Sequence, residues 1–251
     1  LYNARHPDAA FTKEEQGWIV EGSMKEDTPP RWMNHFYDPI TKNGWSGAHA
    51  GDVSSSTVRI LSSLFVSSAK PVSSVAWMHD DRLQNAYRLY GGNHTWEEGI
   101  RLYAESKAVD RKATFMTLGH ILHLLEDAGV PDHVRDDTHV HDLATVTGDP
   151  GSSHENYAVR WDQGLLPTLR VASSVIAANI PPARYQTPDE YLHALASYVN
   201  TYFFSHDTIN ALSIGVASKY ALPQIRREDS EWGYGVDEMG KEFPIVGVEK
   251  M

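Results

Sequence analysis

Cysteine is absent from this 251-residue sequence. Without thiols the chain forms neither disulfide bonds nor thiolate metal sites, and it has no cysteine nucleophile. Any metal ion that it binds must therefore be held by nitrogen and oxygen atoms, which histidine and the carboxylates supply. The sequence also has no Gly-x-Ser-x-Gly elbow and no Gly-rich phosphate loop, which disfavours a serine hydrolase and a nucleotide-dependent transferase.

Long apolar runs are missing too. The most apolar stretches, such as residues 59–67, are interrupted by serine, whereas a membrane-spanning helix needs about 20 consecutive, mostly apolar residues. We therefore expect a soluble protein with no transmembrane segment.

Basic residues are few. The 22 Lys and Arg stand against 33 Asp and Glu, which gives a net charge of −11, and no block rich in Lys or Arg occurs. Binding to a polyanion depends on such positive clusters. Duplex nucleic acid and an anionic membrane surface are therefore not expected as partners, and the composition predicts no particular oligomeric state.

The fold class predicted from the pattern is all-α. Residues are 41% hydrophobic, which suits one globular domain over residues 1–251. Apolar residues recur at helical spacing and strict alternation is rare, so we expect a single multi-helix domain with a Gly- and acid-rich tail over residues 226–251. The clearest predicted helices span residues 13–21, 53–68, 96–106, 111–127, 153–161, 166–180 and 187–204.

Histidine is the residue in excess, and six of the 13 fall between His120 and His154, interleaved with carboxylates. His123 and Asp127 are four residues apart on a predicted helix, so their side chains project from one face and can share a metal ion. His133 follows six residues later, past a Gly-Val-Pro turn. The three together are more specific than any single pair and predict a metal site. His120, three residues before His123, can be a ligand or can hold one by a hydrogen bond.

A second cluster lies upstream, in the segment from Gly22 to Asp27 and in His35-Phe36-Tyr37-Asp38-Pro39. With both clusters in view, the sequence resembles the zinc-dependent phospholipase C and P1 nuclease superfamily, and the bacterial phospholipase C branch is the most similar. That branch carries Gly-x-x-x-x-Asp, then His-Phe-Tyr-Asp-Pro, and later a helix ending in His-x-x-x-Asp before a turn with Pro and His. The motifs cover residues from about 13 to 160.

The resemblance implies a helical fold of that type and a site of two to three zinc ions. Asp27, His35, His123 and Asp127 match the ligands of one zinc, with Asp127 bridging to a second, and His133 begins the shell of a third. In the family a His-x-x-x-Glu motif completes that shell. Glu155 matches its Glu.

Two departures from the family pattern are visible. Gly151 stands where the His of that motif is expected, so the remaining nitrogen ligand is predicted to be His139, with His141 and His154 as alternatives. The family's N-terminal helix, with its Trp and His ligands, is expected to be missing from this sequence, because too little chain precedes Asp27. His6 is a weak substitute, since its position fits no motif. The protein then either is a truncated form or keeps two metals.

The activity implied by the resemblance is that of a phosphoric diester hydrolase, most similar to phospholipase C, which cleaves by a metal-activated water. Asp27 or a neighbouring carboxylate is the expected proton acceptor. The expected substrate is a phospholipid head group or another phosphodiester, and the family implies a secreted or periplasmic protein. A single-strand nuclease or 3′-nucleotidase remains an alternative, as does a degenerate, non-enzymatic metal-binding relative. Aromatic residues near His35, notably Phe36, Tyr37 and Trp45, either fill the core or line a lipid or base pocket.

Overall fold

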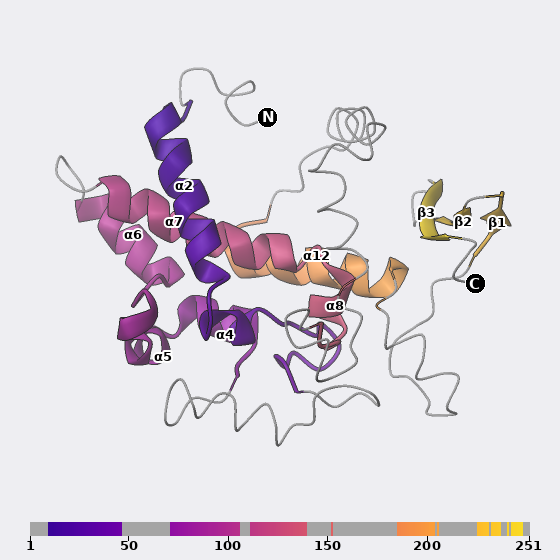
Figure 1. Ribbon diagram of the computed structural model, residues 1–251, viewed down its shortest axis with the longest axis horizontal. Coiled ribbons are helices and arrows are strands. Elements are labelled where there is room, and N and C mark those ends of the chain that lie inside the picture. The colour runs from indigo at the N-terminus through magenta and orange to yellow at the C-terminus, as the bar shows by residue number, and fades with distance from the viewer. Residues whose placement is uncertain are drawn as a thin grey trace. The chain divides into compact units, whose positions relative to one another are not determined.

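The computed structural model describes residues 10–46, 71–105, 111–139, 152, 185–203, 205, 225–230, 232–236, 240 and 242–247. The described part is mostly helical, as predicted, and ends in a small sheet (Figure 1). Its elements in chain order are α2 (Lys13–Glu26), η2 (Arg31–Asn34), α4 (Ser74–His79), α5 (Asp81–Ala86), η3 (Arg88–Tyr90), α6 (Trp96–Glu105), α7 (Arg111–Asp127), α8 (Pro131–Val134), α12 (Pro188–Tyr202), β1 (Arg227–Glu228), β2 (Trp232–Val236) and β3 (Glu242–Gly247). The helices predicted over residues 53–68, 153–161 and 166–180 lie outside the described residues.

Contacts within the chain divide it into two compact units. The first unit consists of Leu1–Tyr37, Lys42–Ser46 and Ser55–Asp127, and the second of Asp38–Thr41, Gly47–Ser54 and Ala128–Met251. A single domain over residues 1–251 stays a prediction. Among the described helices, none is both long and apolar enough to cross a membrane.

Helix α2 starts where the sequence predicted and runs further. Its start is a capping box: the Glu15 backbone N–H donates to the Thr12 hydroxyl at 3.2 Å, and the Thr12 N–H donates to the Glu15 carboxylate at 2.8 Å. The helix continues beyond the predicted end at Glu21, and a Lys25–Glu21 ion pair at 2.8 Å bridges its last turns. The extra length places Glu26 in the final turn of α2 and Asp27 at its C-cap.

Helices α2 and α7 cross each other (Figure 1), and a glycine of each helix lies at the crossing. A Cβ atom added to Gly119 would lie 2.1 Å from the Ile19 carbonyl oxygen, and one added to Gly22 would lie 2.1 Å from the Met116 carbonyl oxygen. Real side chains do not approach backbone so closely, so this crossing requires glycine on both helices. The close approach brings the C-terminal half of α7 against the end of α2.

The rest of the first unit packs against this crossing. Helix α6 lies against α7 and matches the helix predicted over residues 96–106 to within one residue. Helices α4 and α5 were not predicted, because six residues each are too few to show a helical period. Trp77 on α4 is fully buried, and its ring meets the Tyr87 ring edge-on at 4.8 Å.

In the second unit, α8 and α12 are joined by hydrogen bonds between distant parts of the chain. The Arg135 guanidinium donates to the Asn200 carbonyl at 2.6 Å, and the Asn200 amide donates to the Val134 carbonyl at 2.7 Å. Helix α12 falls within the helix predicted over residues 187–204, and Thr187 is its N-cap, whose hydroxyl accepts from the Glu190 N–H.

The Gly- and acid-rich tail over residues 226–251, for which no strands were predicted, contains a small sheet. Strands β1, β2 and β3 form an antiparallel sheet in that order. The Arg227 side chain on β1 links all three strands. Its guanidinium lies 3.8 Å from the Tyr234 ring centre on β2 and donates to Glu242 on β3 at 3.1 Å. The strands are two to six residues long, and glycine takes alternate positions in β2, so their alternation is too brief to detect in the sequence.

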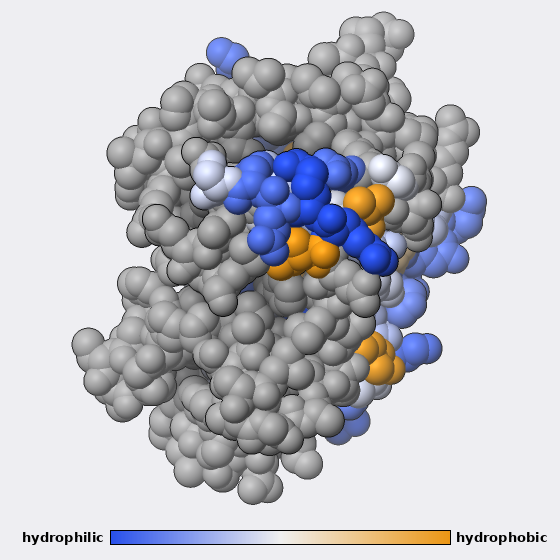
Figure 2. All heavy atoms as spheres, turned by 90° about the vertical axis from the view of Figure 1, so that its right-hand side faces the viewer, coloured by the Kyte–Doolittle hydropathy of each residue, from blue (hydrophilic) through white to orange (hydrophobic). Residues whose placement is uncertain are grey.

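Hydrophilic and hydrophobic residues lie next to each other on the face shown in Figure 2. The described atoms of that face therefore form no large apolar patch of the kind that marks a docking surface.

Candidate metal centre

Three of the predicted ligands meet in the first unit. Asp27 is the C-cap of α2, His35 is the C-cap of η2, and His123 lies on α7. One ligand atom from each lies within 4.8 Å of the other two. His35 is buried and the Asp27 side chain is 63% exposed, so the cluster is anchored in the core and reaches the surface. Among the described residues no other group of this kind occurs.

Asp127, the fourth predicted ligand of this zinc, lies between the two histidines. Its Oδ2 is 2.8 Å from Nδ1 of His35 and 3.3 Å from Nε2 of His123, and that Nε2 is 3.9 Å from Oδ1 of Asp27. Ligand atoms that share a tetrahedral zinc at about 2.0–2.2 Å lie roughly 3.3–3.6 Å apart. The Asp127–His123 separation falls in this range, the Asp127–His35 separation is shorter and the His123–Asp27 separation is longer. The donors therefore lie near the spacing that one zinc ion requires, and they are the nitrogen and oxygen atoms that a chain without cysteine must use.

The charge balance of the cluster centres on His35. Burial lowers the pKa of His35, but the Asp127 carboxylate, aided by Glu26, outweighs burial and raises that pKa to about 9. His35 is therefore held as a cation against two carboxylates. A metal ion bound by His35 would take the place of this proton.

The sequence did not identify Glu26, which lies directly behind His35. Its fully buried carboxylate accepts from Arg31 Nε at 2.8 Å and from Trp77 Nε1 at 2.6 Å, and it also pairs with His120 Nδ1 and with His35 Nε2, the latter at 3.4 Å. Burial raises the pKa of Glu26, but Arg31 and the histidines hold it well below its usual range. Because α2 was predicted to end at Glu21, Glu26 fell in a loop, and nothing in its neighbours marked it as buried.

His120 is directed at Glu26 and not at the four ligands, so of its two predicted roles the structure favours the supporting one. Its ring stacks on the ring of His94 at 3.8 Å between centres. His94 Nε2 is 3.1 Å from the Gly91 carbonyl, which can only accept, so Nε2 carries the proton; Nδ1 then accepts from the Thr117 hydroxyl at 2.9 Å. Burial and the nearby His120 and Arg31 lower the pKa of His94 to about 3.

Acid should therefore destabilise the folded state through protonation of His94. Between about pH 6.5, the ordinary value, and about 3, the unfolded chain binds a proton that the folded chain excludes, so the free energy of unfolding falls as the pH falls through this range and is fully regained above it. The slope from one such group is at most about 1.4 kcal/mol per pH unit. Urea unfolding at several pH values should show a shallower acid slope for His94→Gln. His79→Gln, which removes a partly exposed histidine of the same unit, is the control, and an unchanged slope in His94→Gln would contradict the assignment.

The second unit brings together two further predicted ligands. His133 Nε2 lies 3.0 Å from His139 Nε2, and the ring centres are 4.7 Å apart. Nδ1 of His139 is 3.0 Å from the Asp137 carbonyl, which fixes the proton on Nδ1 and leaves the Nε2 lone pair directed at His133. A histidine held in this way is oriented as metal-binding histidines are. Glu155, and the alternatives His141 and His154, lie outside the described residues, as do His6 and Gly151.

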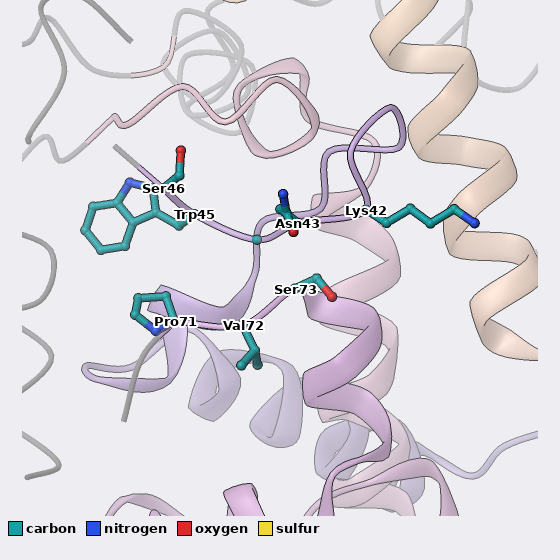
Figure 3. Close-up of a pocket in the computed structure, with 8 residues that line it drawn as sticks. Lys42, Asn43, Trp45, Ser46, Pro71, Val72 and Ser73 are labelled. Atoms are coloured by element: carbon teal, nitrogen blue, oxygen red, sulfur yellow. The ribbon is translucent and has the colours of Figure 1, made fainter. Parts of the chain in front are cut away.

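A pocket of about 410 Å³ lies beside the aromatic residues that follow His35 (Figure 3). Trp45 and Pro71 lie together at one side, whereas the Lys42 side chain extends away. Trp45 stacks on Phe36, with 5.8 Å between ring centres. Phe36 and Tyr37 are buried and do not line the pocket. Of the three aromatics, only Trp45 therefore lines this pocket, and no histidine or carboxylate lines it.

The arrangement can hold a divalent metal ion between the exposed Asp27 carboxylate, the half-buried His123 and the buried His35. No model of a known protein family, no curated protein and no solved structure matches the chain.

Proposed function

We propose that the protein is a zinc-dependent phosphoric diester hydrolase, most similar to phospholipase C, with the helical fold of the phospholipase C and P1 nuclease superfamily. The observation that carries the proposal is the convergence of Asp27, His35, His123 and Asp127. These residues come from three separate segments of the chain, and the ligand atoms of Asp27, His35 and His123 lie within 4.8 Å of one another. The same ligand set is implied by sequence motifs in separate parts of the chain, so the convergence of these residues in the fold supports the proposal.

Zinc ions, when bound, acidify water and stabilise charge on a phosphate. The chain's own residues supply the rest. His35 and His123 are held in place by packing and by Asp127, and the exposed Asp27 carboxylate can accept a proton from water at the surface of the site. His133 and His139 are the proposed nitrogen ligands of a further ion, with Glu155 as its carboxylate. The proposed location is outside the cell or in the periplasm.

Metal content is the direct test. The purified chain should bind two to three zinc ions, measured by mass spectrometry of metals, and a chelator should abolish hydrolysis of a chromogenic phosphodiester until zinc is restored. Fewer than one ion per chain would contradict the proposal. Two or three ions without hydrolysis would point to the non-enzymatic metal-binding relative.

The zinc-loaded protein then separates the substrate classes. We expect hydrolysis of phosphatidylcholine in mixed micelles to exceed hydrolysis of short single-stranded DNA, because the acidic chain disfavours a polyanion. The opposite order would favour the nuclease alternative, and duplex DNA serves as the negative control.

A further inference from the structure

We propose that Glu26 is a positioning residue, which fixes the ring of His35 so that Nδ1, and not Nε2, faces the metal. The proposal rests on the function proposed above and adds a residue to that site. It concerns how a ligand is held, and Glu26 itself is too deeply buried to meet a substrate.

The two ring nitrogens of His35 face different carboxylates. Nε2 lies 3.4 Å from Oε1 of Glu26, and Nδ1 lies 2.8 Å from Oδ2 of Asp127. A neutral imidazole has one N–H and one lone pair. With the N–H on Nε2 directed at Glu26, the lone pair is on Nδ1, beside the Asp127 oxygen that also approaches His123. A carboxylate behind a metal-binding histidine sets the tautomer and the ring orientation in this way.

Glu26 is itself held rigidly. Arg31 approaches Oε2 through Nε and Nη2, and Trp77 donates to Oε1. Arg31 is fixed in turn, because it donates to the Gly92 carbonyl at 2.9 Å and to the Gln84 amide oxygen at 3.1 Å. The Arg31 charge balances that of Glu26, so the Glu26 carboxylate faces His35 Nε2 in a fixed orientation and competes little with His35 for the metal ion.

A purely structural role predicts different behaviour. If Glu26 only pairs with Arg31 in the core, its replacement lowers stability but leaves the affinity of the folded protein for zinc unchanged. Glu15 offers a matched control, since it is also a buried glutamate on α2 and pairs with Arg111 and Thr12, away from the ligands.

The experiment compares Glu26→Gln with Glu15→Gln. In Glu26→Gln only one side of the amide accepts, and the two Arg31 nitrogens at the Oε2 position hold the oxygen there, so the NH2 group is left facing His35. We expect zinc affinity, measured by competition with a chromogenic chelator, to fall about 10–100-fold in Glu26→Gln and to stay within about twofold in Glu15→Gln. Because Glu26→Gln leaves the Arg31 charge buried, a double variant with Arg31→Gln repeats the measurement with the charge removed, and it should show the same loss.

A second readout does not depend on affinity. In the zinc-loaded wild type, ¹⁵N NMR of labelled histidine should show the His35 proton on Nε2. A proton on Nδ1, or unchanged zinc affinity in both Glu26 variants, would overturn the positioning role while leaving the proposed function intact. A wild-type chain that binds no zinc would overturn both.

Discussion

Replacing Asp127 by Asn is expected to remove zinc and phosphodiester hydrolysis together. Oδ2 of Asp127 lies between the ligand nitrogens of His35 and His123, at 2.8 and 3.3 Å. Asn keeps the size of the side chain but loses its charge and one of its two acceptor oxygens. Residues that only support a ligand typically cost 10–100-fold in metal affinity when changed, so loss of a ligand should exceed about 100-fold.

Glu126→Gln is the matched control for this change. Glu126 directly precedes Asp127 on α7 and is exposed, so the variant removes the same charge from the same helix and leaves the centre intact. Zinc content and hydrolysis should match the wild type in Glu126→Gln and disappear in Asp127→Asn. If Asp127→Asn keeps its zinc and its activity, the centre has been assigned to the wrong residues.

Replacing Gly119 by Ala is expected to destabilise the first unit by about 2–3 kcal/mol. The added Cβ would lie 2.1 Å from the Ile19 carbonyl oxygen and 2.9 Å from the Ser23 backbone nitrogen. Both are backbone atoms of α2, so the helices must separate to admit one methyl group. The separation also moves Asp27 away from His123, so zinc should bind more weakly. Thermal and urea unfolding measure the first effect, and chelator competition measures the second.

Gly17→Ala, on α2, is expected to have the opposite effect on stability. A Cβ at Gly17 meets no atom within 4 Å, and the residue is exposed on α2. Alanine is favoured over glycine within a helix by about 0.5–1 kcal/mol, so this variant should be slightly more stable than the wild type and should bind zinc equally. Equal stability of Gly17→Ala and Gly119→Ala would show that the crossing is not as close as described.

Much of the local structure was predictable because its causes are local. Helix starts depend on nearby residues, such as the capping residues Thr12 and Thr187, and α7 shows apolar residues at helical spacing over its length. The predicted starts of these helices agree with the structure. The end of α2 was not predictable. Its last turn is stabilised by packing against α7, and its own residues show no helical pattern. The sheet of β1 to β3 was missed because pairing between strands, and not the alternation within one, stabilises it.

The sequence by itself determined which atoms can bind a metal here, because the absence of cysteine leaves only histidine and carboxylates, and the spacing of His123 and Asp127 places both on one helical face. Only the tertiary structure decided that Asp27 and His35 meet them and that Glu26 supports His35. The physical reason is the crossing of α2 and α7 at Gly22 and Gly119. A contact between backbones nearly 100 residues apart leaves no periodic trace, yet it brings the end of α2, with Glu26 and Asp27, next to His123 on α7.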